Sequence, residues 1–174
     1  MIDTMSETTC PYEVVPLEDI RAGIDAVVRR YKKFSKLDRS AVRINTLEFP
    51  VTENHYSRTT IYNDGETEIL VCVWNRATDT SLHNHGGSDC GFVVLKGKLV
   101  EEVVYVHRNR YLNRAGNISR SLLEGDSAYL SDPYRFHRIT STCDSNIVSV
   151  HLYSPPLKHY SELLPNGQLA SRSV

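Results

Sequence analysis

The sequence predicts an all-β barrel or sandwich with a small helical cap at its N-terminus. From about residue 56 onward, short segments with strand character recur at regular spacing. Turn-forming sequences separate them, at 63–65, 96–98 and 124–126. Before residue 45 the apolar residues instead follow the spacing of an amphipathic helix. This change of period marks the boundary between the cap and the barrel.

The chain of 174 residues is most simply one domain, long enough for a real core. We expect a single domain over 1–174, with the cap at about 12–45 and the barrel at about 46–165. Apolar residues make up 40% and charged residues 24%, values that are ordinary for a globular protein in water.

The bulk charge and hydropathy give no sign of a nucleic-acid-binding protein or a membrane protein. A formal net charge of -1 gives no electrostatic argument for binding nucleic acid or a membrane surface. No stretch is apolar for the length of a membrane-spanning helix, and the first eleven residues lack the apolar core of a secretory signal. We therefore expect a cytoplasmic protein whose thiols stay reduced. No Cys-x-x-Cys pair occurs among the four cysteines, at 10, 72, 90 and 143, which predicts free thiols.

The first elements along the chain are a loose tail over residues 1–11 and then a helix from Leu17 to about Tyr31. Acidic residues stand in the first turn of this helix and basic residues near its end, as the helix dipole favours. A second short helix is expected over 38–44. The apolar positions of the first helix are Leu17, Ile20, Ile24, Val27, Val28 and Tyr31.

Eight strands are expected after the cap. Asn63-Asp64-Gly65 is a hairpin signal between the first two, because these residues tolerate a positive φ. The polar tail after Pro165 is expected to fray. The strands are expected at 58–62, 68–74, 90–95, 99–106, 119–123, 127–130, 137–140 and 147–153.

His83 and His85 form the most suggestive local pattern. On a strand, side chains two residues apart project from the same face, so both imidazoles could reach one metal ion. Gly86 and Gly87 follow directly, and we expect them to leave room for the metal or a ligand. The pattern alone is also compatible with two surface histidines at a strand end.

A third histidine extends the pattern into a resemblance to the cupin family. The first cupin motif is matched by His83-x-His85 with Gly97 at the following turn, and the second by Gly125, Pro133 and His137. The resemblance implies a double-stranded β-helix, a jelly-roll barrel. Most cupins carry a glutamate a few residues after the second histidine. Here Cys90 stands there, preceded by Asp89, to which we assign no role.

This departure has a chemical consequence. Three neutral imidazoles leave a divalent metal its full charge and about three open positions on a six-coordinate ion. Those positions would suffice for a bidentate substrate and oxygen. An anionic sulfur ligand would complete the charge balance, since a metal deprotonates a coordinating thiol.

Further motifs resemble the cysteine dioxygenases, which are cupins with a three-histidine iron site and a cysteine in place of the glutamate. The chain reads Ser149-Val150-His151-Leu152-Tyr153-Ser154-Pro155-Pro156 near its end, Tyr56-Ser57-Arg58 near its first strand, and Trp74 before the histidine pair. The resemblance spans about 56–156. It implies a Cys90–Tyr153 thioether and an arginine, Arg58, that holds the substrate carboxylate.

The resemblance implies oxidation of L-cysteine to L-cysteine sulfinate with Fe(II) as cofactor and O2 as co-substrate, in cysteine catabolism and taurine biosynthesis. It also implies a monomer. His83, His85 and His137 would hold the iron. Tyr56 and Arg58 would bind the substrate. The catalytic group would be Tyr153, Cys90, His151 and Ser149, with Tyr153 poised beside the iron by the last two.

Alternatives remain at this stage. The substrate could be another thiol carboxylate such as 3-mercaptopropionate, although relatives with that preference tend to carry glutamine where this chain has Arg58. The protein could also be a non-catalytic cupin that binds a metabolite. Residue by residue, Ser149, His151 and Tyr153 could form a hydrogen-bonded row inside a barrel. Cys90 could be a small buried hydrophobe, and Trp74 is expected to serve in packing.

Overall fold

The computed structural model describes residues 11–53, 55–76, 78–107, 110–111, 118–142 and 145–174. The tail expected at the start falls almost wholly outside them, as do Cys10 and Cys143. One α-helix, α1 (Leu17–Arg30), is followed by a short 3-10 helix, η1 (Lys32–Phe34). The strands are β1 (Tyr12–Val14), β2 (Glu48–Pro50), β3 (Ser57–Asn63), β4 (Glu68–Trp74), β5 (Leu82–His83), β6 (Asp89–Lys96), β7 (Lys98–His107), β8 (Arg110–Tyr111), β9 (Ile118–Leu123), β10 (Ser127–Leu130), β11 (Arg135–Ser141), β12 (Ile147–Ser154), β13 (His159–Leu163) and β14 (Leu169–Ser173).

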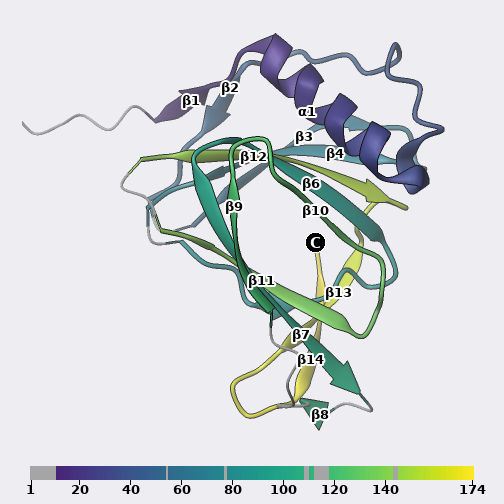
Figure 1. Cartoon of the computed structure of the whole chain (residues 1–174), viewed down its shortest axis with the longest axis vertical. Helices are drawn as coiled ribbons and strands as arrows, with labels where there is room; N and C mark the ends of the chain where they lie inside the picture. The colour runs from purple at the N-terminus through teal and green to yellow at the C-terminus, as the bar shows by residue number, and fades with distance from the viewer. Residues whose placement is uncertain (1–10, 54, 77, 108–109, 112–117, 143–144) are drawn as a thin grey trace, which may run out of the picture.

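Two sheets enclose a common interior (Figure 1), and the all-β prediction is confirmed. One sheet has the order β10-β6-β12-β4-β3. The other has the order β14-β13-β5-β11-β7-β8, with β9 also pairing with β7. All eight expected strands are present, and β4 and β10 have the expected bounds. Because neighbours in the sheets come from distant parts of the chain, residues far apart in sequence meet inside the barrel.

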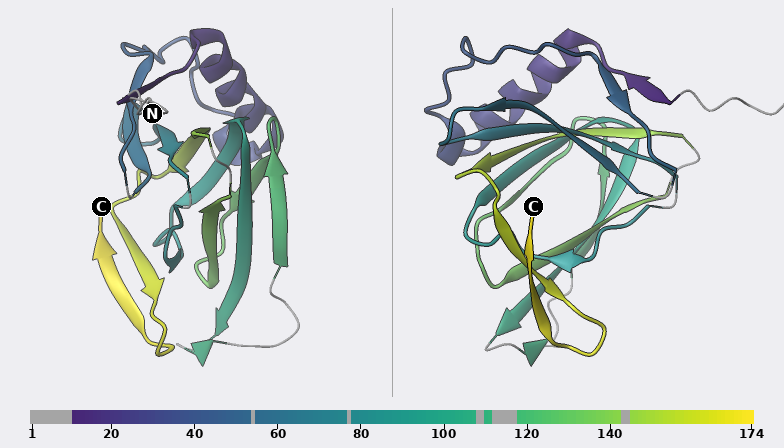
Figure 2. Two further views of the ribbon diagram at one scale, coloured as in Figure 1. Left: turned by 90° about the vertical axis from the view of Figure 1, so that its left-hand side faces the viewer. Right: turned by 180° about the vertical axis from the view of Figure 1, so that it is seen from behind.

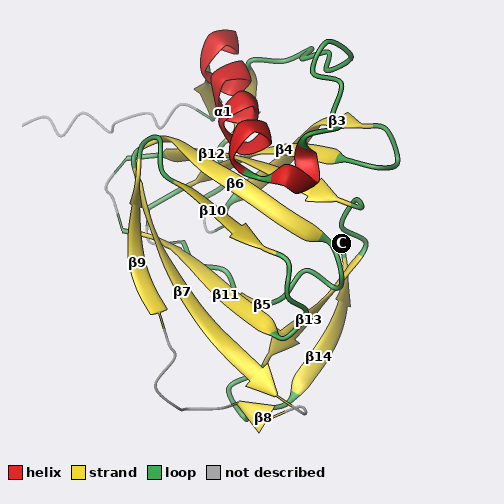
Figure 3. Cartoon of the chain, turned by 45° about the vertical axis from the view of Figure 1, so that its right-hand side comes forward, coloured by secondary structure: helices red, strands yellow, loops and turns green. Residues whose placement is uncertain are grey.

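The central strands β4, β6 and β12 of the five-stranded sheet are buried on both faces, which explains their continuous apolar runs. Alternate residues of β4 point to opposite sides. Val71 and Val73 pack with α1 in one core, whereas Cys72 and Trp74 belong to the core inside the barrel. In β12, Val150 likewise faces the helix. Figure 3 shows α1 lying over the outer face of this sheet.

Helix α1 packs closely on β6, as its amphipathic pattern predicts. Its buried residues include Ile20, Ile24 and Val27. Gly91 of β6 lies beneath it, and a Cβ atom there would stand 2.8 Å from Val27 and from Phe34. A larger residue there would force these side chains to move, so Gly91 allows α1 to lie close to the strand that carries Cys90.

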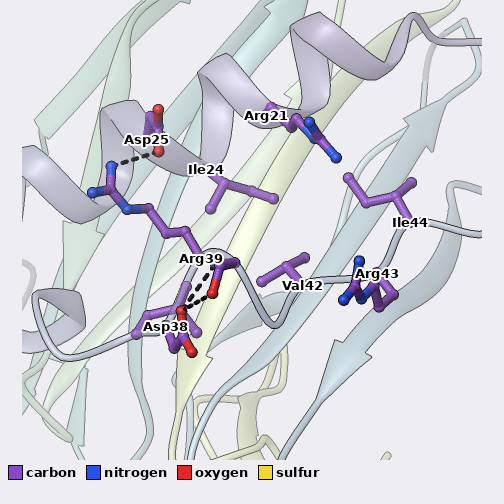
Figure 4. Close-up of a pocket in the computed structure, with 10 residues that line it drawn as sticks. Arg21, Ile24, Asp25, Asp38, Arg39, Val42, Arg43 and Ile44 are labelled. Atoms are coloured by element: carbon purple, nitrogen blue, oxygen red, sulfur yellow. Dashed lines mark hydrogen bonds and ion pairs between the residues drawn. The ribbon is translucent and has the colours of Figure 1, made fainter.

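The helix expected over 38–44 is absent; that prediction was wrong. The segment forms turns instead (Figure 4). One carboxylate oxygen of Asp38 accepts hydrogen bonds from the backbone N–H and the hydroxyl of Ser40, at 3.0 and 2.6 Å. Such local bonds compete with helix formation. Arg39 then pairs with Asp25 of α1 at 2.8 Å, which ties the segment to the helix.

The tail after Pro165, which was expected to fray, instead forms β14, and β14 pairs with β13 in the hairpin that Figure 2 shows in yellow. Strand β13 also pairs with β5, with Glu162 opposite His83. Gly86, at a φ of +57°, accommodates this hairpin: a Cβ atom there would lie 1.9 Å from the carbonyl oxygen of His159. The expectation that Gly86 leaves room for a ligand is therefore wrong, since it leaves room for backbone.

Among the described residues, no helix combines the length and the apolar character that crossing a bilayer requires.

Candidate functional site

Three histidines meet inside the barrel. His83 of β5 and His137 of β11 are direct partners across adjacent strands. His85 follows two residues later, beyond the end of β5, and not on the strand as the spacing suggested. One ring nitrogen from each of the three lies within 4.8 Å of the others. The arrangement is a candidate site for one metal ion.

Hydrogen bonds orient two of these rings. His83 Nδ1 lies 2.8 Å from the backbone carbonyl of Ser81, and His137 Nδ1 lies 3.0 Å from Oε1 of Glu101. A carbonyl and a carboxylate only accept, so each Nδ1 carries the proton and each Nε2 keeps its lone pair. Nε2 of His137 stands 3.1 Å from Nε2 of His85. Nitrogen atoms converge in this way around a cation.

The electrostatics of the site also suit a metal. Burial lowers the pKa of His83 and lowers the pKa values of His85 and His137 well below their ordinary range. The proximity of the other imidazoles adds to this effect for both His85 and His137. The three rings are therefore neutral near pH 7, the form that binds metals such as iron, zinc, copper or nickel.

A cavity of about 190 Å³ opens beside His83. A narrower extension leads inward to Cys72, Trp74 and His137. Cys72, expected in the core, is thus both buried and part of the cavity wall. The residues that line the cavity include Tyr56, Arg58, Tyr153, Leu157 and Tyr160.

Arg58 and Tyr56 come to this cavity from the start of β3 and the residue before it. The Tyr56 ring stacks on Trp74 with ring centroids 4.4 Å apart, and burial raises the pKa of its hydroxyl to about 12. In the described part of the chain, no carboxylate forms an ion pair with Arg58. Its guanidinium therefore brings a positive charge to the cavity wall that a bound anion could balance.

Cys90 and Tyr153 are opposite one another on β6 and β12. Both side chains belong to the core inside the barrel. Burial raises the pKa of both groups, so both stay protonated at neutral pH. The Tyr153 ring also meets His85 edge to face, with centroids 5.3 Å apart. The structure thus brings the expected cysteine and tyrosine together beside the histidines.

Ser149 and His151 precede Tyr153 on the same face of β12. Trp74 donates its indole N–H to Ser149 Oγ at 2.8 Å, and that hydroxyl lies 2.9 Å from Nε2 of His151. Trp74, expected only to pack, therefore also takes part in hydrogen bonding. Burial lowers the pKa of His151 to about 3. Its Nδ1 is buried without a hydrogen-bond partner, and its ring stacks with that of Tyr153 at 6.3 Å.

Asp89 lies at the start of β6, immediately before Cys90. One of its carboxylate oxygens accepts a hydrogen bond from the Tyr129 hydroxyl at 2.9 Å. Its other oxygen pairs with Lys33 of η1 at 3.0 Å. Asp89 therefore ties the helical cap to the end of the strand that carries Cys90.

Two site residues escaped the sequence reasoning. Tyr160 lines the cavity and meets His83 edge to face, with ring centroids 5.6 Å apart, but no strand was predicted over its segment. Glu101 bonds His137, and its side chain is 0% exposed. The sequence does contain a sign of Glu101's role. Glu101 places a charge between Leu99 and Val103 on the inward face of a strand, and a buried charge needs a partner.

Comparison with known proteins gives both a family and a fold. The family described as "Cysteine dioxygenase type I" matches residues 18–163. Cysteine dioxygenase type 1 of Rattus norvegicus and that of Homo sapiens are each 29% identical over 94 residues, 53% of this chain and 47% of the relative. The protein of Danio rerio is 30% identical over 99 residues, 55% of this chain and 48% of its own. Each match thus covers about half of the curated relative.

Solved structures support the fold alone, because sequence identity is low. A protein of Klebsiella pneumoniae with a double-stranded β-helix domain superposes with a TM-score of 0.50 and 14% identity, over 64% of this chain and 82% of its own. An oxalate oxidase in complex with glycolate also superposes with a TM-score of 0.50 and 14% sequence identity, and the match covers 60% of this chain and 53% of the oxidase chain. The cupin double-stranded β-helix expected from the motifs is confirmed.

Proposed function

Because this chain belongs to the cysteine dioxygenase type I family, we propose that it oxidises L-cysteine to L-cysteine sulfinate with Fe(II) and O2. The observation that carries the proposal is that three neutral imidazoles and a cysteine–tyrosine pair lie together, and that His83, Arg58 and Tyr153 line one small cavity. A non-catalytic binding module would need the cavity and a metal, but it would not need the cysteine–tyrosine pair.

His83, His85 and His137 would hold the iron, His83 and His137 through the Nε2 nitrogen whose lone pair their hydrogen bonds leave free. When bound, Fe(II) supplies the redox chemistry that adds both atoms of O2 to the substrate sulfur. The protein supplies neutral ligands, since burial lowers the pKa of every ring in the group. Because the three ligands carry no charge, an anionic thiolate substrate would fit the site electrostatically.

Arg58 would bind the substrate carboxylate. The guanidinium presents two N–H groups in a plane, a geometry that matches a carboxylate. Arg58 and His83 line the same cavity, so a small molecule can reach both. Tyr56, fixed by stacking on Trp74, would form the wall beside the arginine. Cysteine has the thiol, amine and carboxylate for such a site, and 3-mercaptopropionate lacks only the amine.

Tyr153 would hold its hydroxyl toward the reacting sulfur and oxygen. Its pKa is raised well above the ordinary value by burial, so the group acts as a hydrogen-bond donor and not as a phenolate. His151 and Ser149 would support it from the same strand, with Trp74 anchoring the serine hydroxyl. Cys90 would restrain the tyrosine ring through a thioether.

The proposal extends to the whole protein: a single cupin domain over 1–174 that acts as a cytoplasmic monomer in cysteine catabolism and taurine biosynthesis. The two cysteines among the described residues are free thiols, in keeping with a reducing compartment.

Oxygen uptake with three thiols tests the proposal. The protein would be loaded with Fe(II) without oxygen and then mixed with cysteine, cysteamine or 3-mercaptopropionate in buffer that contains O2. We expect the fastest uptake with cysteine. Faster uptake with 3-mercaptopropionate would favour the alternative substrate, and metal binding without uptake for any thiol would favour the binding module.

A further inference from the structure

Glu101 is a buried carboxylate that touches a proposed iron ligand. It lies on β7, two residues before Val103, which is the direct partner of His137 on β11. A long side chain spans this diagonal of an antiparallel pair. Oε1 of Glu101 accordingly accepts a hydrogen bond from Nδ1–H of His137. The distance between the nitrogen and the oxygen is 3.0 Å, and both side chains are buried.

Arg120 balances the charge of that carboxylate from the other side. It stands directly opposite Glu101 on β9 and donates its Nε–H to Oε2 at 2.7 Å, with the side chain 39% exposed. The two carboxylate oxygens therefore have separate partners: Oε1 faces the imidazole and Oε2 faces the guanidinium. A buried carboxylate without such pairing is costly. Together the three groups form a row from the barrel interior to the surface.

Within this row, the direction of each hydrogen bond is fixed. A guanidinium only donates and a carboxylate only accepts, so His137 must donate through Nδ1. Its Nε2 then has a free lone pair and points at Nε2 of His85. A proton on Nε2 instead would block the metal-binding atom. His83 meets the same requirement with a neutral backbone carbonyl, that of Ser81.

We propose that Glu101 and Arg120 are positioning residues for the metal centre: Glu101 holds His137 in the Nδ1–H tautomer and Arg120 holds Glu101 in the orientation that does so. The inference rests on the proposed metal site. It does not rest on the identity of the substrate. Groups that fix the tautomer and orientation of a histidine ligand are typically worth 10–100-fold in metal affinity.

Glu101→Gln tests the proposal with a side chain of the same shape. Arg120 can only donate, so it will attract the amide oxygen of the glutamine. The amide NH2 must then face Nδ1 of His137, and the ring has to accept there and carry its proton on Nε2. We expect the metal-free variant to show the Nε2–H tautomer of His137 in imidazole 15N NMR spectra. The parent should show the Nδ1–H tautomer.

The same variant should bind Fe(II) about 10–100-fold more weakly in an anaerobic titration. Adding Arg120→Gln to Glu101→Gln frees the amide to turn its oxygen toward His137. This double variant should regain part of the affinity and the Nδ1–H tautomer. A lost structural contact would not be restored by a second substitution.

Glu102→Gln is the matched control. Glu102 is the next residue on β7 and pairs with Arg138 at 3.2 Å, across the same two strands but on the partly exposed face. It should leave both tautomer and affinity unchanged. The proposal would be overturned if Glu101→Gln kept the His137 tautomer and the Fe(II) affinity of the parent. It would also be overturned if Glu102→Gln lost as much Fe(II) affinity as Glu101→Gln. If Glu101→Gln loses Fe(II) affinity but the parent protein oxidises no thiol, the positioning role of Glu101 is upheld and the proposed function is refuted.

Discussion

Cys90 and Tyr153 face each other directly across β6 and β12. Both side chains belong to the core inside the barrel, and the Tyr153 ring meets that of His85 edge to face. A bond from the sulfur to the ring carbon beside the phenol oxygen would remove one hydrogen from each residue, with O2 as the oxidant. The register of two strands thus places both partners of a thioether beside the proposed iron site.

The first prediction is that turnover with Fe(II), O2 and cysteine forms this cross-link. The product should lack two hydrogens by mass and migrate faster on a reducing denaturing gel. Cys90→Ala should give only the slower band and reduced, but not abolished, activity, because the proposed iron ligands remain. Cys72→Ala is the matched control, since Cys72 is also a buried thiol of the barrel interior. Peptide mapping that finds Cys90 free after many turnovers would refute the cross-link.

The second prediction concerns the iron ligands. Replacing His83, His85 or His137 with alanine should remove most of the bound iron and abolish oxygen uptake, because only two of the three imidazole ligands then remain. Iron content per chain, measured after anaerobic loading and desalting, checks this. His55→Ala, at an exposed position outside the cavity, should keep the parent iron content. A histidine whose replacement keeps full iron and full rate is not a ligand.

The third prediction concerns substrate choice. Arg58→Ala should raise the KM for cysteine about ten- to a hundred-fold, since a charge-assisted hydrogen bond is worth roughly 1.5–3 kcal/mol. It should also lower kcat through poorer positioning. Cysteamine, which has no carboxylate, should lose little. Arg58→Gln should shift kcat/KM toward 3-mercaptopropionate. Equal losses for cysteine and cysteamine would mean that Arg58 supports the fold and does not bind the carboxylate.

The fourth prediction is that the metal-free protein loses stability as the pH falls from 7 to 5. Below about pH 6.5 the unfolded chain protonates its histidines. The folded chain does not protonate His151, whose pKa burial lowers to about 3. The unfolded state then binds the extra proton, and each such histidine removes up to about 1.4 kcal/mol per pH unit. Urea unfolding measures the slope, which His151→Gln should reduce. A stability that is flat over this range would contradict it.

The barrel could be predicted from sequence because its strands are short, recur at regular spacing and are separated by turn residues. β4 is a clear case, since a run of apolar residues bounded by a hairpin signal leaves little choice. The helix over 38–44 failed because Asp38 bonds Ser40 locally, a side-chain effect that apolar spacing does not report. The β13–β14 hairpin was missed because it is half-exposed and largely polar, so its stability comes from pairing with β5.

The site residues divide in the same way. Histidines close in sequence, and motifs that resemble those of a family, could be recognised directly. Glu101 could not be placed by motif, because its contact with His137 depends on the register of β7 against β11. The role of Gly86 was misassigned because its neighbour in space, His159, lies on a strand that was not predicted. Contacts set by long-range pairing were the ones that required the structure.

The most direct test of the central claim is the fate of labelled oxygen. The Fe(II)-loaded protein would be supplied with cysteine and 18O2, and the product analysed by mass spectrometry. Our account predicts cysteine sulfinate that carries two 18O atoms, with one O2 consumed for each sulfinate formed. The account would be contradicted if the product were cystine, which carries no 18O. It would also be contradicted if the protein formed no more sulfinate than free Fe(II) does without protein.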